Sequence, residues 1–307
     1  MSAGDPIYVV TGATGRVGRQ VVERLLERGL RVRAVNRHGD VPAVWRAAGV
    51  EAVHGSAADA QALTQAFEGA AGVVLLAEPA FADSDPVERA AAAGAAVAKA
   101  LRDGRVPCTV MLSTLGAHLE SGNGIAAMGH RFERALAGAT QTMVRLRSAW
   151  WMQDWAAAAA LARDKGMLPS FLQRIDTPIP MVSAVDVARV VVDELLGAIG
   201  QVTIELAGPV DISPADVANA YALVLDQPIR PIPIARAEWP QMLAAWGNSP
   251  RAVALWIETF EAMDAGRLVF EAPRNARIRT MHGHQTIADV ITRLSELDPN
   301  ARSARTS

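Results

Sequence analysis

Short apolar runs rich in β-branched residues alternate with longer helical patterns along the first half of the chain. The runs predict strands at Ile7–Val10, Arg31–Val35, Glu51–Val53, Val73–Ala77, Thr109–Ser113 and Thr142–Leu146. Between the runs, apolar residues recur at helical spacing, for example at Val17, Val21, Val22, Leu25 and Leu26. This alternation predicts stacked βαβ units, and therefore an α/β fold with a doubly wound parallel sheet of the Rossmann type.

The pattern changes after residue 149, where six of the seven tryptophans and most of the prolines lie. Three helices are expected to begin there, because a Ser or Thr is followed three residues later by an Asp. These pairs are Ser183 with Asp186, Ser213 with Asp216, and Thr286 with Asp289. A strand is expected at Gln201–Ala207 and a proline-rich extended segment at Ile229–Ile234.

Three regions follow from this change of pattern. Residues 1–207 are expected to form the dinucleotide-binding core, with an insertion at about residues 150–178. Residues 208–299 are expected to form a smaller helical lobe that packs on the core and contributes to the substrate site. The polar residues 300–307 are expected to form a frayed tail.

Composition narrows the class of protein. Hydrophobic residues make up 50% of the chain and charged residues 20%, which favours a well-packed globule. A formal net charge of −2 gives no reason to expect nucleic acid or an anionic membrane as a partner. Cys108 is the only cysteine, so no disulfide framework or zinc cluster is expected, and no metal site is predicted. With neither a signal peptide nor a long uncharged apolar run, the sequence predicts a cytoplasmic protein.

A glycine-rich turn follows the first expected strand and leads directly into a helix. Gly12 permits the tight turn, Gly15 leaves room for a pyrophosphate, and Gly18 lets the helix pack against the strand. The free N–H groups at the helix N-terminus would bind the phosphates. The predicted phosphate-binding turn comprises Thr11, Gly12, Ala13, Thr14, Gly15, Arg16, Val17 and Gly18.

The end of the second strand indicates which dinucleotide is bound. A carboxylate there would select the ribose 2′-hydroxyl of NAD, whereas an arginine favours the 2′-phosphate of NADP. The chain has Asn36, Arg37 and His38 at this point, with no acidic residue before Asp40. NADP(H) is therefore predicted in preference to NAD(H), although Arg37 could also be an ordinary surface charge.

Several segments together resemble the NmrA-like family of atypical short-chain dehydrogenases/reductases. The similar segments are Thr11–Gly18, Leu112–Ala117, Arg147–Gln153, Pro180–Ala188 and Ile204–Pro209. The resemblance implies a Rossmann core that binds NADP(H) or NAD(H), with a C-terminal lobe closing over the nicotinamide. It also implies that Ala77, Glu78 and Pro79 border the ribose near the nicotinamide, with Ser113 beside the cofactor. Ser56 stands where the family often has an acidic residue in the adenine pocket.

Typical enzymes of this superfamily use a Tyr-x-x-x-Lys pair, which this chain lacks. Tyr8 and Tyr221 are the only tyrosines, and neither is followed by a lysine at the required spacing. Ala126 and His130 occupy the corresponding helix positions in the family's layout. Thr114 and His130 are the remaining candidates for catalysis, the histidine because its pKa suits acid–base work. A surface position on the helix is the alternative for His130.

Two tryptophans and neighbouring polar groups form the expected substrate wall. Trp150 and Trp151 offer aromatic faces, Gln153 an amide, and His118 a further polar group, although core packing and an ordinary loop histidine are the alternatives. The leading hypothesis is an NADPH-dependent reductase acting on a small quinone or enone. The second is a non-catalytic NADP(H)/NAD(H) sensor that regulates a protein partner, and the third is epimerase- or isomerase-like chemistry.

Overall fold

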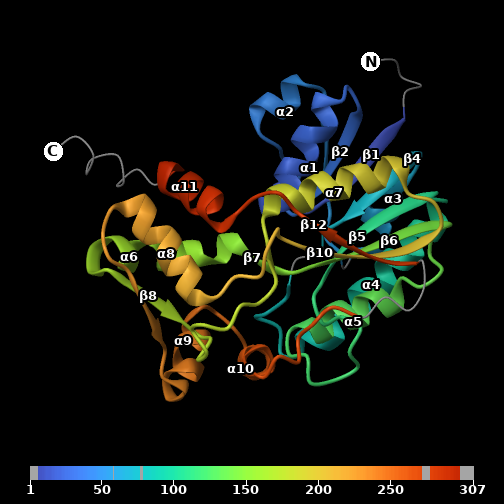
Figure 1. Ribbon diagram of the computed structural model, residues 1–307. Helices are drawn as coiled ribbons and strands as arrows, with labels where there is room; N and C mark the ends of the chain where they lie inside the picture. The colour runs from blue at the N-terminus through green and yellow to red at the C-terminus, as the bar shows by residue number, and fades with distance from the viewer. Residues whose placement is uncertain (1–5, 58, 77–78, 272–276, 298–307) are drawn as a thin grey trace.

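The computed structural model describes residues 6–57, 59–76, 79–271 and 277–297. Its main feature is an eight-stranded sheet with the order β12-β10-β6-β5-β4-β1-β2-β3 (Figure 1). Every neighbouring pair in this sheet is parallel. The order reverses between β1 and β4, as it does in doubly wound dinucleotide-binding folds. The predicted Rossmann-type α/β fold is therefore confirmed.

The strands of the sheet agree closely with the apolar runs of the sequence. They are β1 (Ile7–Thr11), β2 (Arg31–Asn36), β3 (Glu51–His54), β4 (Ala70–Leu75), β5 (Cys108–Thr114), β6 (Thr142–Ser148), β10 (Gln201–Ala207) and β12 (Ile278–His282). β10 has the predicted bounds, whereas β4 begins at Ala70, earlier than the predicted Val73. Ala77, the predicted end of that strand, lies outside the described residues.

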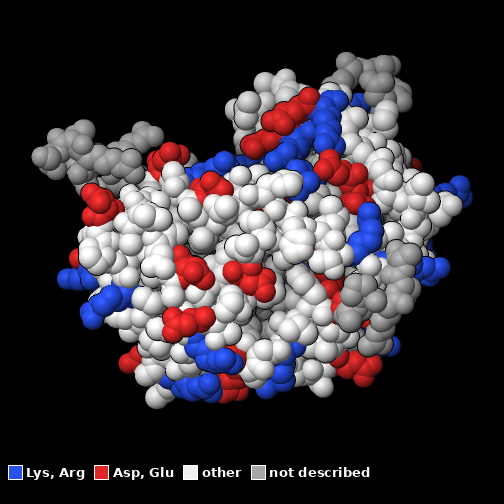
Figure 2. Space-filling model, viewed as in Figure 1, with Lys and Arg blue, Asp and Glu red and all other residues white. Residues whose placement is uncertain are grey.

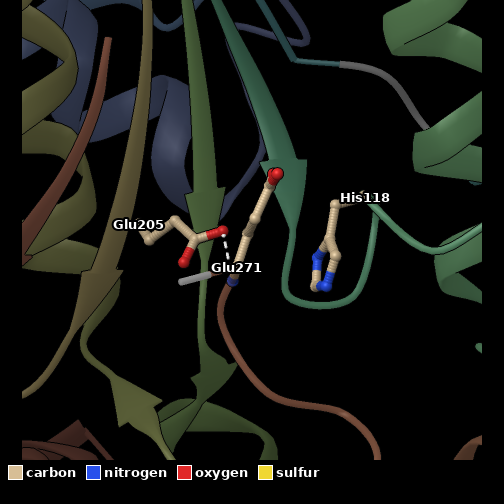
Figure 3. A group of neighbouring side chains, drawn as sticks. All are labelled: His118, Glu205 and Glu271. Carbon is tan, nitrogen blue, oxygen red and sulfur yellow. Dashed lines mark hydrogen bonds between the residues drawn. The ribbon is translucent and has the colours of Figure 1, made fainter. Parts of the chain in front are cut away.

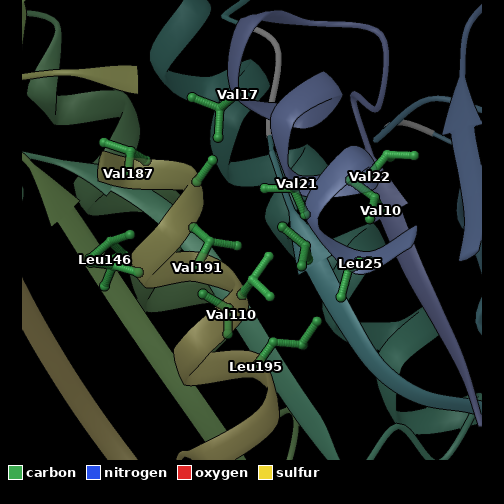
Figure 4. Close-up of a cluster of buried hydrophobic side chains, with 14 of the residues drawn as sticks. Val10, Val17, Val21, Val22, Leu25, Val110, Leu146, Val187, Val191 and Leu195 are labelled. Carbon is green, nitrogen blue, oxygen red and sulfur yellow. The ribbon is translucent and has the colours of Figure 1, made fainter. Parts of the chain in front are cut away.

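One face of the sheet is covered by α1 (Arg16–Glu27) and α7 (Ala184–Gly197). Valine and leucine side chains of these two helices face each other and the sheet, as Figure 4 shows for Val21, Val191 and Val110. All three are fully buried. α2 (Ala43–Ala47) contributes the buried Trp45 to the same core. Burial of this continuous apolar surface is the main force that fixes the helices on the sheet.

The opposite face is covered by α3 (Ala60–Phe67), α4 (Pro86–Asp103) and α5 (Ala126–Ala135). Phe67, Leu101 and Leu136 are fully buried in the core between these helices and the sheet. α4 and α5 pack closely, since a Cβ on Gly94 would lie 2.7 Å from the Ala135 Cβ. This packing sets the position of α5 beside the end of β5, where the functional site lies.

A smaller lobe lies beside the sheet (Figure 1). Its elements are β7 (Trp150–Trp151), η1 (Met152–Ala158), α6 (Ala159–Lys165), β8 (Met167–Ser170), β9 (Met181–Val182), α8 (Pro214–Leu225), β11 (Arg230–Pro233), η2 (Arg236–Glu238), α9 (Trp239–Ala245), α10 (Pro250–Asp264) and α11 (Ile287–Leu297). Two short sheets, β11-β8 and β7-β9, brace it. Its separate core contains Trp239, Tyr221 and Phe260. The segment Ile278–His282 returns from the lobe to the large sheet.

The three predicted helix starts of the second half are confirmed. The hydroxyl of Ser183 accepts the amide of Asp186 at 3.1 Å, and Ser213 and Asp216 form a complete capping box. Thr286 caps α11 in the same way, through the amide of Asp289 at 3.2 Å. None of the helices in the described part of the chain combines the length and the apolar character needed to cross a bilayer.

Candidate functional site

The glycine-rich turn between β1 and α1 has the geometry that its sequence predicts. Gly12 has a φ of +57°, and a Cβ on it would lie 2.9 Å from the Leu76 carbonyl oxygen. A Cβ on Gly18 would lie 2.2 Å from the Gly12 carbonyl oxygen, so only glycine lets the helix come this close. The turn is thus fixed by backbone contacts at both of these positions.

The N-terminus of α1 has free donors for an anion. The helix begins after Gly15, and no side chain caps it. Among the described residues, a Cβ on Gly15 would have one neighbour within 4 Å, the Gly12 carbonyl oxygen at 3.2 Å. The helix dipole and the uncapped amides favour negative charge at this point. These features fit the pyrophosphate of a dinucleotide.

A continuous cavity of about 670 Å³ runs from this turn toward the lobe. Of the predicted site residues, those that line it are Thr11, Gly12, Asn36, Arg37, Pro79, Ser113, Thr114, Trp150 and Trp151. Gly55, Ser56 and Ala57 line it as well, beside Arg37 at the ends of β2 and β3. The cavity therefore joins the phosphate-binding turn, the end of β5 and the tryptophan segment in one space.

Other predicted site residues lie outside this lining. Ala13, Thr14, Gly15, Arg16, Val17, Gly18, His38, His118, His130 and Gln153 are not among the lining residues. Ala77 and Glu78 lie outside the described residues. Ala13 is fully buried and Val17 nearly so, both in the core below the turn. The structure thus brings nine of the predicted residues together in the lining of the cavity.

Asn36 fixes the backbone after β2. Its Oδ1 accepts the amides of His38 and Gly39, both at 2.9 Å, and its amide donates to the Asp40 carbonyl at 2.8 Å. This turn presents Arg37 to the cavity and leaves its side chain exposed. The predicted anion-binding arginine is therefore held by its neighbour at the dinucleotide end of the cavity.

Arg16 reaches from the phosphate-binding turn across to the lobe. Its Nη1 lies 2.8 Å from Asp154 Oδ1, and its guanidinium carbon lies 5.5 Å from the Trp151 ring centroid. Partial burial raises the pKa of Asp154, although the Arg16 guanidinium acts in the opposite direction. Asp154 lines the cavity and was missed by the sequence analysis, because its role depends on this contact over 138 positions.

A buried ionic network lies behind the end of β5. The Ser113 hydroxyl donates to Glu133 Oε1 at 2.5 Å, and Arg147 binds the same carboxylate through Nε at 3.0 Å and Nη2 at 2.8 Å. Burial disfavours the charged form of Arg147, but hydrogen bonds to Glu133 and Glu271 and the negative charges around it outweigh burial and raise its pKa. Because Ser113 donates inward to Glu133, its oxygen faces a ligand as an acceptor.

His118, Glu205 and Glu271 lie together at the outer end of this network (Figure 3). Each offers an atom that could ligate a metal, and these atoms lie within 4.8 Å of one another. However, Arg147 Nη1 lies 2.8 Å from Glu271 Oε2 and 3.4 Å from Glu205 Oε1. A guanidinium thus supplies the positive charge that these carboxylates need. Burial raises the pKa of Glu205, more than the Glu271 amide and Arg147 lower it.

The remaining polar candidates have different surroundings. His130 Nδ1 lies 2.9 Å from the Ala117 carbonyl oxygen, which ties the histidine to the loop after β5. Gln153 accepts the amide of Ala184 at 3.1 Å and so braces the start of α7. Thr114 lines the cavity, and its side chain has no hydrogen bond to another described residue. Of the two predicted catalytic residues, Thr114 is therefore the one that faces the cavity.

The lobe end of the cavity is built from aromatic rings. Trp256 of α10 lies 5.9 Å from Trp150 in an edge-on arrangement and 5.3 Å from Phe81, between ring centroids. Trp256 and Phe81 line the cavity, although neither was predicted from the sequence. Their contribution depends on contacts between distant segments. The one feature of the sequence that pointed to an aromatic wall was the concentration of tryptophan in the second half of the chain.

The outer surface carries charges of both signs. On the face seen in Figure 2, small groups of Lys and Arg alternate with groups of Asp and Glu over a largely uncharged surface. The near-neutral balance of the whole chain, at −2, agrees with this mixture.

Comparison with known proteins supports the same assignment. A family model described as NAD(P)H-binding matches residues 12–197, which is more than half of the chain. A curated relative from Streptomyces griseus, (4-alkanoyl-5-oxo-2,5-dihydrofuran-3-yl)methyl phosphate reductase, is 31% identical over 228 residues, covering 73% of this chain and 76% of the relative.

Solved structures share the fold over nearly the whole length. An Escherichia coli NADPH-dependent quinone oxidoreductase complexed with NADPH matches with a TM-score of 0.75 and 21% identity, covering 94% of this chain and 99% of that chain. Citrobacter triphenylmethane reductase complexed with NADP(H) matches with a TM-score of 0.71 and 17% identity, covering 97% and 99% of the two chains. These matches show that the chain shares its fold with these proteins, as the resemblance noted in the sequence implies. The chain belongs to the NAD(P)H-binding family.

Proposed function

We propose that this protein is an NADPH-dependent reductase that transfers hydride to a small conjugated acceptor, a quinone or an enone. The observation that carries this proposal is the single cavity of about 670 Å³ that connects the phosphate-binding turn to an aromatic wall. Such a space can hold a dinucleotide and a planar acceptor in contact. The reductase from Streptomyces griseus supports the choice of reaction, since its name describes an unsaturated oxo-furan.

The cofactor preference in this proposal depends on Arg37. This side chain lines the cavity at the ends of β2 and β3, next to Gly55 and Ser56. A guanidinium there can form charge-assisted hydrogen bonds to a 2′-phosphate. Bound NADPH would supply the hydride from its nicotinamide. Ser113 would accept a hydrogen bond from the cofactor, because its own proton is directed to Glu133.

No protein acid is required to accompany hydride transfer to a quinone or enone, because water can supply the proton as negative charge develops on oxygen. The described lining residues include no histidine, tyrosine or lysine. The Thr114 hydroxyl can donate a hydrogen bond to the acceptor's carbonyl oxygen and so orient it. Trp151 would support the acceptor's flat face. Its indole N–H donates to Ser148 Oγ at 3.0 Å, which fixes the ring.

One observation favours a second function, that of a non-catalytic dinucleotide sensor acting on a protein partner. The acidic side chains of the described lining, Asp83 and Asp154, are each within ion-pair distance of an arginine. Among the described lining residues, therefore, both carboxylates are already engaged in ion pairs and none is available for acid–base work. An epimerase would need such a group to move a proton on and off its substrate. Of the three functions considered, epimerase-like chemistry therefore has the least support from the lining.

The test is oxidation of saturating NADPH by a panel of quinones and enones, followed by absorbance. We expect measurable turnover, and Trp151→Ala should raise KM or lower kcat several-fold. Trp246→Ala is the matched control, because Trp246 is 58% exposed and lies outside the lining. If NADPH binds but no acceptor oxidises it above background, the reductase proposal fails. Protease sensitivity with and without the dinucleotide would then test the sensor.

A further inference from the structure

The lobe end of the cavity is a slot between rings and aliphatic side chains. Phe81 and Trp256 form one side, with tilted planes and centroids 5.3 Å apart, and Trp150 meets Trp256 edge-on. Ile125, Met128 and Gly129, at and after the start of α5, also line the cavity, and Gly129 lies beside Thr114. Aromatic and aliphatic surfaces of this kind stack a flat molecule and offer its substituents few polar partners.

The slot is fixed by hydrogen bonds between the core and the lobe. The amide of Ser249, at the start of α10, donates to the Phe81 carbonyl at 2.8 Å. The amide of Ile125 donates to Thr259 Oγ1 of the same helix at 2.9 Å. A Cβ on Gly124 would lie 2.1 Å from that oxygen, so the two segments are in close contact. These contacts hold the segments that carry the rings against each other.

Charges near the slot are matched in pairs. Arg89 Nε lies 3.3 Å from Asp83 Oδ2, and Arg16 binds Asp154 at 2.8 Å. Among the described lining residues, the other charged side chain is Arg37, at the dinucleotide end. An anionic substituent in the slot would therefore either displace a carboxylate from its arginine or be buried against hydrocarbon. Burying an ion without a partner is strongly unfavourable.

We propose that the acceptor is an uncharged planar molecule, and that phosphate, sulfonate and carboxylate substituents are excluded from the slot. This inference deepens the proposed reductase function and rests on it. It also separates this protein from its Streptomyces griseus relative, whose named substrate carries a phosphate. Selectivity comes from the ion pairs that already engage the arginines near the slot, and stacking on Trp256 and Phe81 supplies the affinity.

A matched pair of acceptors tests the proposal: 1,4-naphthoquinone and its 2-sulfonate, each at saturating NADPH. The sulfonate is the more easily reduced quinone, so slower turnover would reflect binding. We expect kcat/KM to be at least 100-fold lower for the sulfonate. Equal or faster turnover of the sulfonate would overturn the proposal. Trp256→Ala should raise KM for the neutral quinone by about 10-fold, whereas Trp246→Ala should leave it unchanged.

A gain of function provides the reciprocal test. Met128→Lys places a cation in the slot without removing either tryptophan. We expect the ratio of kcat/KM for the sulfonate to that for the neutral quinone to rise at least 10-fold. If this variant does not fold, Ile125→Arg serves the same purpose on the neighbouring turn. A folded variant with an unchanged ratio would count against charge as the basis of selection.

Binding measured by calorimetry with NADP⁺ present separates this inference from the proposed function. If neither quinone oxidises NADPH, the reductase proposal fails, but the slot can still be judged from the two dissociation constants. Tighter binding of the neutral quinone by at least 30-fold supports the slot as a site for uncharged planar ligands. Similar dissociation constants, tighter binding of the sulfonate, or no binding of either overturns it.

Discussion

The two ends of the cavity are built in different ways. The dinucleotide end is made mainly of backbone, within a short stretch of sequence around Gly12 and Gly18, where contacts of 2.9 and 2.2 Å would exclude a Cβ. The lobe end is made of large side chains, Phe81, Trp150 and Trp256, that come from three distant segments. The difference shows that the glycine-rich turn is encoded locally, whereas the aromatic end of the cavity, where the proposed function places the second ligand, is encoded by tertiary packing.

The largest expected effect concerns the ionic network where the two ends meet. Arg147→Met should lower the free energy of unfolding by about 3–5 kcal/mol, because it leaves Glu133, Glu205 and Glu271 buried without their cation. Urea unfolding at pH 7 is the measurement. Arg145→Met is the comparison on the same strand, since Arg145 makes a long hydrogen bond of 3.4 Å to Gln201 and interacts with Glu133 only through space. Equal stability of Arg147→Met and the unaltered protein would mean that the carboxylates are protonated when folded.

A side chain at Gly15 should abolish dinucleotide binding and leave the fold intact. Gly15→Val should weaken binding of both NADPH and NADH by 100-fold or more, about 3 kcal/mol, because the side chain would occupy the pyrophosphate position. The measurement is calorimetric titration of each dinucleotide into a variant whose circular dichroism is normal. Gly197→Val is the control, at an exposed position at the end of α7 where no described atom would lie within 4 Å of the added Cβ. Binding that survives Gly15→Val would mean that the phosphates lie elsewhere.

Arg37 should contribute to the binding of NADPH but not to that of NADH. Arg37→Ala should weaken NADPH by roughly 1.5–3 kcal/mol, the value of a charge-assisted hydrogen bond, and leave NADH nearly unchanged. Parallel titrations measure this difference. Arg24→Ala, on α1, serves as a control for the loss of one positive charge. Equal losses for the two dinucleotides would remove Arg37 from the 2′-phosphate site.

Asp186 joins the core to the lobe and gives a pH-dependent test. Burial disfavours its charge, but hydrogen bonds from Gln285, His284 and Ser183 outweigh burial and lower its pKa. The stabilisation is therefore complete well above the ordinary carboxyl pKa of about 3.9 and is lost as the pH falls through the lower, folded value. Asp186→Asn should cost about 1.5 kcal/mol at pH 7 and much less at pH 3. Urea unfolding at both pH values measures this, and a constant difference would contradict it.

The smallest effect is expected where Arg16 bridges the two ends. Arg16 and Asp154 side chains are 43% and 47% exposed, so Arg16→Ala should change stability by less than about 1 kcal/mol. Arg28→Ala is a matched control, since Arg28 and Asp193 are 2.7 Å apart with exposures of 42% and 46%. Thermal unfolding should not distinguish the variants, but only Arg16→Ala should weaken NADPH binding several-fold. If Arg16→Ala and Arg28→Ala had the same effect on NADPH binding, Arg16 would be an ordinary surface residue with no role in the site.

The fold was predictable because its signals are local. Periodicity of two and of 3.6 residues identifies the strands and helices, and β10 has the predicted bounds at Gln201–Ala207. The glycine turn was predictable for the same reason, since strand, turn and helix are contiguous. Capping of α7, α8 and α11 also depends on residues three positions apart.

The lobe end could be predicted only in part. Trp150 and Trp151 follow β6 directly, so their place near the strand ends could be inferred. Trp256 could not, because its helix is distant in sequence and its ring reaches the cavity only through the contacts of α10 with Phe81 and Ile125. His130 was proposed for acid–base work from its position in the family's layout. The contact of its Nδ1 with the Ala117 carbonyl oxygen is one that periodicity cannot reveal.

The placement of β12 has a consequence for how the protein is made. This strand pairs with β10 at the edge of the sheet, yet it is synthesised after nearly all of the lobe. Until it emerges from the ribosome, β10 has one row of unpaired backbone groups, the kind of edge that promotes association between nascent chains. The finished edge is protected by polar residues such as Arg279, which pairs with Glu194 at 2.7 Å. Truncation before Ile278 would therefore leave a chain prone to aggregate, even with its dinucleotide-binding turn intact.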